Sequence, residues 1–145
     1  MAQKQLKIFL KVHYISLMST TNSGLSKHVI SVFESREDFL NLLKVNPGVV
    51  IIKFGATWCG PCKQLSPVLE KIAAEFNGKF ILAKVDIDKN PNIAAAFQVQ
   101  SIPTVFVAIG GQVAPLFQGA QPYPQVKQVI EAVLEQAKQL GVTGN

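Results

Sequence analysis

The chain has 145 residues, 48% of them hydrophobic, and a formal net charge of +5. This length suits one domain, and the apolar fraction is sufficient for a core that needs no disulfide staple to fold. Residues 1–33 carry four lysines and no acid, whereas the rest carries 10 Lys and Arg against 9 Asp and Glu, so the folded part has no basic stripe and nucleic-acid binding is excluded.

Residues 1–26 do not look like part of a globular fold. "MAQKQLKIFLKVHYISLM" mixes lysine with apolar residues, and the "STTNSGLS" that follows is typical of a polar linker. Lys11 interrupts the apolar run that a secretory signal requires, and the lack of arginine fits a transit peptide poorly. We predict a flexible extension; organellar targeting by this tail, or a true start at Met18, stays open. The uncharged stretch 90–126 is broken by Pro, Gly, Gln and Asn, so no membrane span is predicted.

After the tail, strand and helix signals alternate. HVISVF at 28–33 predicts a short strand, and SRED at 35–38 predicts a helix start through a capping box. An NPG turn at 46–48 leads into VVIIKFG at 49–55. This run is apolar on both faces apart from Lys53, which is typical of a central strand covered on both sides.

The middle of the chain predicts a long helix, a strand and a short helix. Apolar residues at helical spacing run from 65 to 76, and Pro67 within them predicts a kink. FILAKVDI at 80–87 is the next predicted strand. An Asn-Pro pair then caps a short helix at 90–97, because proline suits the first helical turn.

The last part predicts a hairpin and a helix. TVFVAI at 104–109 and QVAPLFQG at 112–119 flank a Gly-Gly turn, and an apolar stripe follows over about 122–140. The order βαβαβαββα predicts an α/β fold, a central mixed sheet with helices on both faces, in which the early crossovers imply parallel strands and the final pair is antiparallel. We place one domain at 27–141 and a C-terminal tail at 142–145.

The only two cysteines, Cys59 and Cys62, lie directly after the central strand, beside the only tryptophan, Trp58. The free N–H groups and partial positive charge of a helix start stabilise a thiolate at Cys59 and make it a better nucleophile. Cys62 lies about one turn further on, where it can resolve a mixed disulfide. Gly60 permits the tight turn, and Pro61 suits the helix start.

A metal site is the main alternative for this pair. Structural zinc takes four ligands, but the chain has no second cysteine pair, and its two histidines, His13 and His28, lie upstream. A structural disulfide across two residues would close too small a loop to add much stability. We therefore predict redox chemistry and no metal.

WCGPCK at 58–63 resembles the active site of the thioredoxin family, and the resemblance extends over about 29–137. SIPT at 101–104 looks like the family's cis-proline loop, with Pro103 the cis residue. The family's helix kink, hairpin glycine and close-approach glycine match three more positions: Pro67, Gly111 and Gly119. The resemblance implies the thioredoxin fold and a surface that binds the substrate chain, formed by Trp58, Ile102, Pro103, Thr104 and Gly119.

Lys53 departs from the family pattern. Thioredoxins commonly have a buried aspartate there, thought to help move the proton of the resolving thiol, and their neighbouring lysine resembles Lys84. A buried acid–base pair has thus become two lysines. Three interpretations stay open: a neutral lysine acts as base for Cys62, a charged lysine favours the Cys62 thiolate, or Lys53 extends its head group to the surface.

The resemblance implies a protein-disulfide reductase in which Cys59 attacks the substrate disulfide and Cys62 resolves the mixed disulfide. It implies no bound cofactor besides the redox-active Cys59–Cys62 disulfide, with electrons supplied by NADPH through a flavoprotein reductase. The expected partners are thioredoxin reductase and disulfide-containing proteins. We expect a monomer in the cytoplasm, where a lone Cys-x-x-Cys is usually catalytic.

Two other functions stay open. Residues 82–122 are similar to the thioredoxin-like domain of co-chaperones that continue into helical repeats, which implies a module that holds chaperone clients, with redox activity secondary. A third reading is an oxidant or isomerase in an exported compartment, against which the missing signal peptide counts.

Overall fold

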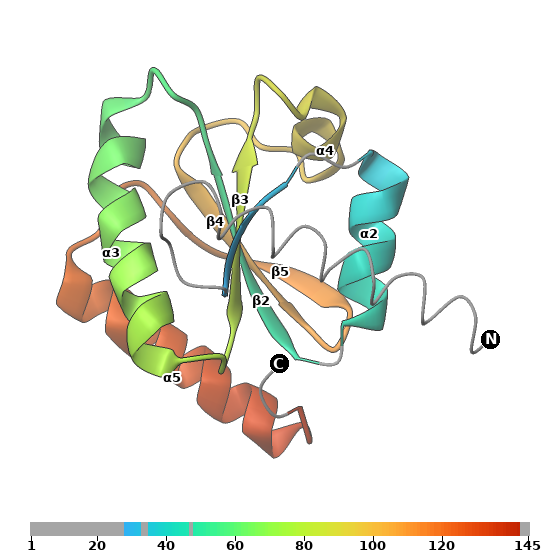
Figure 1. Cartoon of the computed structure of the whole chain (residues 1–145), viewed down its shortest axis with the longest axis vertical. Coiled ribbons are helices and arrows are strands. Elements are labelled where there is room, and N and C mark those ends of the chain that lie inside the picture. The colour runs from blue at the N-terminus through green and yellow to red at the C-terminus, as the bar shows by residue number, and fades with distance from the viewer. Residues whose placement is uncertain (1–27, 33–34, 47, 143–145) are drawn as a thin grey trace.

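A five-stranded mixed sheet forms the middle layer of the structure (Figure 1). The computed structural model describes residues 28–32, 35–46 and 48–142, so the predicted extension 1–26 lies outside the described residues. The spatial order of the strands is β1-β3-β2-β4-β5. Their bounds are β1 (Val29–Ser31), β2 (Val49–Gly55), β3 (Ile81–Asp86), β4 (Thr104–Ile109) and β5 (Gln112–Gln118).

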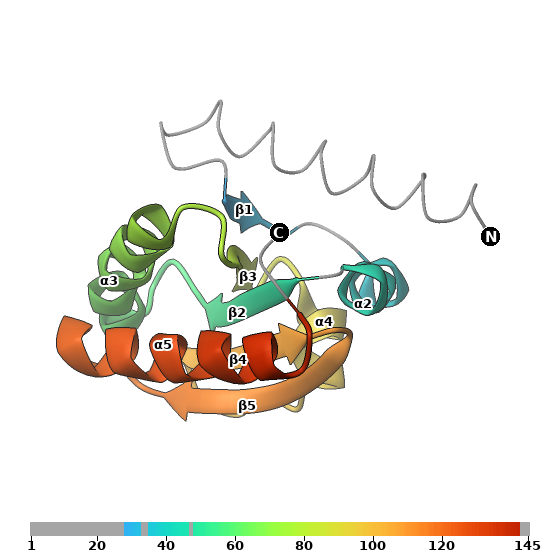
Figure 2. The same cartoon turned by 90° about the horizontal axis from the view of Figure 1, so that it is seen from below.

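Helices cover both faces of this sheet, as the sequence predicts. In Figures 1 and 2, α3 and α5 lie on one side and α2 and α4 on the other, while β1 and β5 form the two edges. The helix bounds are α2 (Arg36–Val45), α3 (Gly60–Phe76), α4 (Pro91–Ala96) and α5 (Tyr123–Gln139).

β2 is the central strand and is buried along its whole length, which confirms the prediction from its two apolar faces. Val49 and Ile51 point into the core under α3 and α5, whereas Ile52 and Phe54 point into the core under α2 and α4. Lys53 follows Val49 and Ile51 in the alternation of a strand, so its side chain faces α3.

The third crossover differs from the early ones. β1, β3 and β2 are parallel, but β4 runs antiparallel to β2, as does β5 to β4. α4 has six residues and rises only about 9 Å, whereas β3 extends about 20 Å. β4 starts at the end of the sheet where β3 stops, and so runs back along β2 in the opposite direction.

Local signals set most helix ends. The Ser35 hydroxyl accepts a hydrogen bond from the Asp38 N–H at 3.2 Å, which confirms the predicted cap of α2. α3 continues through Pro67 as one helix from Gly60 to Phe76.

Asn90 begins α4 as predicted, but its side chain has another role. It occupies the N-cap position of α4 but makes no capping bond with its side chain. The buried amide instead donates to the carbonyls of Val32 at 2.9 Å and Asp86 at 3.1 Å, and so ties the ends of β1 and β3 together.

A polar row crosses the α3 face of the sheet beyond the apolar core. Ser31, Lys84 and Lys53 are register partners on β1, β3 and β2. The preceding row on the same face is apolar and contains Leu82 and Ile51. This change from apolar to polar residues occurs next to the start of α3, where the cysteines lie.

Candidate active site

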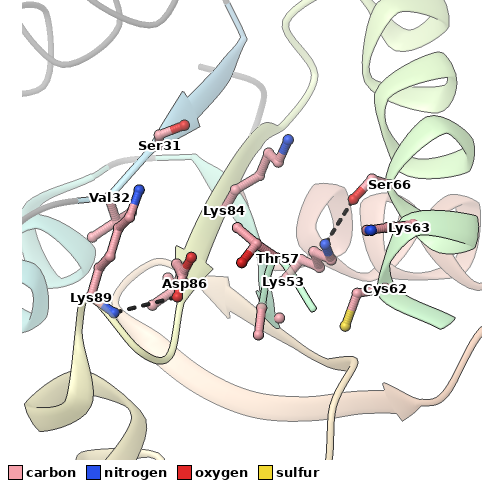
Figure 3. A pocket seen from close by; sticks show the side chains of 13 residues that line it. Ser31, Val32, Lys53, Thr57, Cys62, Lys63, Ser66, Lys84, Asp86 and Lys89 are labelled. Atoms are coloured by element: carbon pink, nitrogen blue, oxygen red, sulfur yellow. Dashed lines mark hydrogen bonds between the residues drawn. The ribbon is translucent and has the colours of Figure 1, made fainter. Parts of the chain in front are cut away.

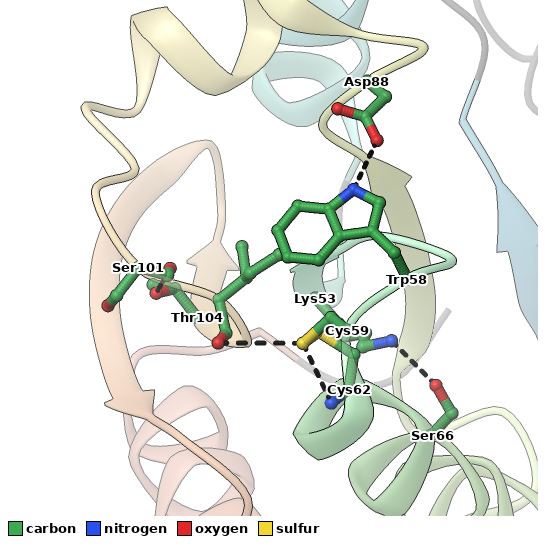
Figure 4. The surroundings of a disulfide bond; sticks show 9 residues. Lys53, Trp58, Cys59, Cys62, Ser66, Asp88, Ser101 and Thr104 are labelled. Atoms are coloured by element: carbon green, nitrogen blue, oxygen red, sulfur yellow. Dashed lines mark hydrogen bonds between the residues drawn. A yellow bond between two sulfur atoms is a disulfide. The ribbon is translucent and has the colours of Figure 1, made fainter.

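Cys59 and Cys62 are joined by a disulfide at the start of α3 (Figure 4). Cys59 is the N-cap residue and Cys62 lies in the first turn, with their Cα atoms 5.3 Å apart. Cys59 is 5% exposed and Cys62 2%. The Cys62 N–H donates to the Cys59 sulfur at 3.2 Å, so a helix-start donor already points at the atom that would carry negative charge as a thiolate.

The predicted proline loop lies against the cysteines. The Ile102–Pro103 peptide bond is cis, and the Ile102 carbonyl oxygen is 3.9 Å from the Cys59 sulfur. That sulfur has no proton while the disulfide is intact, so the approach is a contact that a thiol could convert into a hydrogen bond. The Gly119 N–H donates to the Pro103 carbonyl at 2.8 Å and links the loop to the end of β5.

The remaining predicted substrate-contact residues divide into two groups. Trp58 is 66% exposed, and its indole N–H donates to the Asp88 carboxylate at 2.8 Å. Gly119 has a φ of +80° and open space beside its Cα. Thr104, by contrast, is buried, and its hydroxyl donates to the Ser101 carbonyl. The Thr104 side chain therefore fastens the loop and does not face outward as Trp58 does.

Lys53 is buried beneath α3 and does not extend to the surface. The residue is 6% exposed, and its ammonium group donates to the Ser66 hydroxyl at 2.7 Å (Figure 4). Burial disfavours the charged form and nearby Lys84 repels it, which together lower the pKa of Lys53 to about 8, while Glu70 and Asp86 act in the opposite direction. A fraction of Lys53 is therefore neutral near pH 7.

Lys84 has its own acidic partner. Its ammonium group lies 2.8 Å from a carboxylate oxygen of Glu70, on α3. The family's buried strand aspartate is absent from this chain, so here a carboxylate from the helix faces the lysine pair. Lys53 and Lys84 are direct register partners on neighbouring strands.

Gly55 brings Lys53 and Cys62 together. A Cβ atom at Gly55 would lie 3.0 Å from the Lys53 nitrogen and 3.2 Å from the Cys62 sulfur. The Lys53 nitrogen and the Cys62 sulfur are therefore separated by no more than the sum of these two distances. The lysine nitrogen is therefore within reach of the buried thiol of the reduced protein, directly or through one water.

A pocket of about 420 Å³ opens beside Cys62 (Figure 3), and neither Trp58 nor the proline loop lines it. Its lining comes from three strands, from the start of α3 and from the loops that follow β2 and β3. The described residues that form its polar lining are Ser31, Lys53, Thr57, Cys62, Lys63, Ser66, Lys84, Asp86 and Lys89.

The predictions from sequence missed Ser66, Glu70 and Gly55. A signal for the first two was present, because Cys62, Ser66 and Glu70 follow one another at intervals of four and so form one stripe of α3. A lone lysine in an apolar central strand needs polar neighbours, and this stripe supplies them. The role of Gly55 depends on atomic positions that no sequence pattern specifies.

The described part of the chain contains no group of three or more His, Cys, Asp or Glu side chains that could hold a metal ion. Within the same residues, no helix is both long and apolar enough to cross a membrane.

Comparisons with known proteins agree with this geometry. The family model described as Thioredoxin matches residues 30–132. A thioredoxin from Staphylococcus aureus is 46% identical over 88 residues, which cover 61% of this chain and 85% of that protein.

Two solved structures are also similar. The crystal structure of thioredoxin from Trypanosoma brucei brucei has a TM-score of 0.66 and 33% identity, covering 74% of this chain and 91% of that one. A chain from work on the thiol resolving mechanism in yeast mitochondrial 1-Cys peroxiredoxin via glutathione/thioredoxin systems has a TM-score of 0.62 and 32% identity, covering 71% and 94%.

Proposed function

This chain belongs to the thioredoxin family, whose members are protein-disulfide reductases, and from that premise we propose the roles of its residues. The chain is a thiol–disulfide oxidoreductase, and disulfide-containing proteins are its substrates. The observation that carries the assignment of roles is the position of Cys59 as N-cap of α3, with the Cys62 N–H pointing at its sulfur. Cys59 is the nucleophile and Cys62 the resolving thiol.

The reaction begins with the reduced dithiol. The Cys59 thiolate attacks one sulfur of the substrate disulfide; a Cys59–substrate bond forms, and the electron pair of the broken bond leaves on the other substrate sulfur, which takes up a proton. Cys62 then loses its proton and attacks Cys59. The Cys59–Cys62 bond forms, and the second substrate sulfur leaves with the electron pair and is protonated. The enzyme is oxidised by two electrons and the substrate is reduced by two.

Lys53 is the acceptor for the Cys62 proton. Its nitrogen and the Cys62 sulfur both border Gly55, and its pKa of about 8 leaves a useful neutral fraction at neutral pH. Glu70 forms an ion pair with Lys84, the neighbour of Lys53. The charge of Lys84 repels a charged Lys53, lowers its pKa and so favours the neutral form that accepts the proton. Ser66 accepts a hydrogen bond from Lys53 and fixes the direction of its head group.

Several finer expectations belong to this proposal. NADPH supplies the electrons through a flavoprotein reductase, the folded domain spans 27–141, and the protein acts as a monomer in the cytoplasm. The Cys59–Cys62 disulfide supports the need for an electron donor, because it must be reduced again after each turnover. The reported relatives are thioredoxins and do not support the co-chaperone alternative, so we do not propose it.

Substitution of each cysteine tests the two roles. The dithiol form is prepared with excess reductant, mixed with a disulfide-containing protein, and followed by release of substrate thiol. We expect Cys59→Ser to lose the reaction, and Cys62→Ser to accumulate a mixed disulfide through Cys59 that mass spectrometry detects. A mixed disulfide that forms instead on Cys62 in Cys59→Ser, at the wild-type rate, would reverse the assignment. Turnover with NADPH and a flavoprotein thioredoxin reductase then tests the electron route separately.

Two variants test the role of Lys53 in the resolving step. In wild type we expect the rate of that step to rise with pH, with an apparent pKa near 8 from Lys53. Lys53→Met removes base and charge, and Lys53→Arg keeps the charge but cannot accept a proton. A base role predicts that both variants lose this inflection and slow the step about tenfold or more.

The control is Lys127→Met, whose lysine lies over the Tyr123 ring on α5. Its pH profile should match wild type. A Lys53→Arg profile that also matches wild type would show that only the positive charge acts on Cys62, and would overturn the base role.

A further inference from the structure

A second carboxylate lies in the row of the sheet that follows the two lysines. On the face covered by α3, Lys53 and Lys84 are register partners, and the next partners on that face are Gly55 and Asp86. Neighbouring strands lie about 4.8 Å apart, so the Asp86 side chain starts beside Gly55. Because glycine has no side chain, β2 contributes none between Asp86 and the space over Gly55.

That space is where the reacting groups of the resolving step meet. A Cβ atom at Gly55 would lie 3.0 Å from the Lys53 nitrogen and 3.2 Å from the Cys62 sulfur. Lys53, Cys62 and Asp86 also line the same pocket of about 420 Å³ (Figure 3). A polar hollow of this size admits water, so the carboxylate can act on the lysine directly or through bound water.

The loop after β3 fixes the direction of the Asp86 carboxylate. One carboxylate oxygen accepts from the backbone N–H of Asp88 at 2.8 Å and of Lys89 at 3.3 Å. These backbone donors are neutral, so they hold the carboxylate in place without cancelling its charge. Asp86 therefore presents a negative charge at a fixed position in the pocket that Lys53 lines.

We propose that Asp86 is a positioning residue for the resolving step: its carboxylate is the counter-charge that keeps the transferred proton on Lys53. The proposal rests on the role proposed above for Lys53 as acceptor of the Cys62 proton. When that proton is transferred, Lys53 becomes an ammonium ion in a buried position, where an uncompensated charge is unfavourable. The carboxylate of Asp86 offsets part of this cost and so sets the pH at which the lysine is ready to accept.

Other charged groups surround Lys53 as well. Its register partner on β4 is Val105, which carries no charge. The charged or titratable groups of the described residues that line the pocket or pair within it are Cys62, Lys63 and Glu70 of α3, Lys84 and Asp86 of β3, and Lys89 of the following loop.

These groups act on Lys53 in opposite directions. Burial and the charge of Lys84 lower the pKa of Lys53. Glu70 and Asp86 raise it. Removing the charge of Asp86 should therefore lower the pKa of Lys53 further and enlarge its neutral fraction at pH 7.

A pH titration of the oxidised protein tests this electrostatic effect without any redox reaction. NMR of lysine labelled with ¹³C at Cε reports each amine, and the Lys53 signal is assigned by its loss in Lys53→Met. Asp86→Asn removes the charge and keeps an oxygen that can accept from the backbone. We expect the Lys53 midpoint to fall by about half a pH unit, the effect of one charge several ångströms away in wet surroundings. An unchanged midpoint would overturn the proposal.

The pH profile of the resolving step tests the effect on catalysis. It is measured at saturating substrate, where the resolving step limits release of the second substrate thiol. The inflection of Asp86→Asn should lie about half a pH unit below that of wild type, and the rate at pH 7 should rise about two- to threefold because more Lys53 is neutral. The gain should disappear above about pH 9.5, where Lys53 is neutral in both proteins. An equal change of rate at every pH would indicate a structural defect and would contradict the proposed role.

Glu131→Gln is the matched control. Glu131 is an exposed carboxylate on α5, and its loss changes the net charge by the same amount. Its midpoint and its profile should match those of wild type, and equal shifts in both variants would show an effect of net charge instead of Asp86.

Lys53→Met separates a failure of this proposal from a failure of the proposed function. If Lys53→Met keeps the inflection of wild type, the base role of Lys53 fails, and the role of Asp86 in catalysis fails with it. If Lys53→Met loses the inflection while Asp86→Asn keeps that of wild type, the base role stands and only the role of Asp86 fails.

Discussion

Gly55 is the residue on which the buried part of the site depends most closely. Its backbone has none of the positive φ values that favour glycine, so alanine is allowed by conformation there. The constraint is space, because an added methyl group would lie 3.0 Å from the Lys53 nitrogen and 3.2 Å from the Cys62 sulfur. The lysine head is the flexible end of its side chain and would move first.

Gly55→Ala should therefore alter catalysis more than stability. We expect a loss of about 1 kcal/mol in the free energy of unfolding, at the low end of overpacking effects. The pH profile of the resolving step should move toward that of Lys53→Met, because the lysine nitrogen is displaced from Cys62. A profile identical to wild type would show that the separation of these two atoms does not limit the step.

At the scale of single residues, the sequence motifs located the cysteines and the proline loop, but not the side chains around Lys53. Cys59, Cys62, Trp58 and Pro103 lie where the motifs place them. Thr104 was predicted to contact substrate, but its side chain turns inward to Ser101. The partners of Lys53 escaped prediction because they come from α3, and side-chain contacts between a helix and a strand depend on the packing of both.

At the scale of elements, a buried amide helps to hold the end of β1, beside the hydrogen bond from the Val32 N–H to the Lys84 carbonyl. Asn90 is 4% exposed, and its side chain donates to the carbonyls of Val32 and Asp86. Asp86 also accepts from the Asn90 backbone N–H, at 2.9 Å. If the Asn90 side chain is removed, the Asp86 carbonyl keeps a donor from the Asn90 backbone, whereas the Val32 carbonyl loses the donor that Asn90 supplies.

Asn90→Ala should destabilise the fold by about 2 kcal/mol, since a buried carbonyl loses its donor. Urea unfolding measures this loss. Asn92→Ala is the matched control on the same helix, where the side chain is exposed and the change should stay within about 0.5 kcal/mol. Equal effects of the two substitutions would mean that helix propensity, rather than the β1–β3 link, determines the result.

The order and type of the elements could be predicted because hydrophobic periodicity and turn residues specify them locally. The direction of β4 could not be read in the same way, because the connection over residues 87–103 is long enough to start the next strand at either end of the sheet. The cap of α2 could be predicted because it is local: the Ser35 hydroxyl accepts from the N–H of Asp38, three residues later. Asn90 occupies the predicted N-cap position of α4, but the target of its amide could not be predicted, because Val32 lies 58 residues away in the chain.

At the scale of the whole molecule, the burial of Lys53 lowers the stability of the fold at neutral pH, where most of this lysine is charged. The unfolded chain restores the ordinary pKa of Lys53, 10.5, whereas the folded value is about 8. Between these values the unfolded state binds more protons, so this group makes stability rise with pH. Below about pH 8 the folded state carries the full penalty of a charged, partly desolvated ammonium, and above 10.5 the penalty disappears.

Lys53→Met should therefore be more stable than wild type at pH 7, by at most about 3 kcal/mol, a value that solvent in the adjoining pocket reduces. The gain should shrink as the pH is raised from 8 toward 10.5. Urea unfolding of both proteins at pH 7 and about pH 10 measures the difference, with Lys127→Met as reference. A gain that is equal at both pH values would point to packing and not to the charge of Lys53.

Both cysteines of the sequence belong to one disulfide, so the number of free thiols reports the redox state of the protein. The oxidised protein has no thiol, and the reduced protein has two, so a maleimide titration reports the redox state of the site directly. A Cys62→Ser variant offers one attachment point, at Cys59, the proposed nucleophile. A cleavable crosslinker placed there would retain proteins that dock beside Cys59, and mass spectrometry of the retained proteins would identify them.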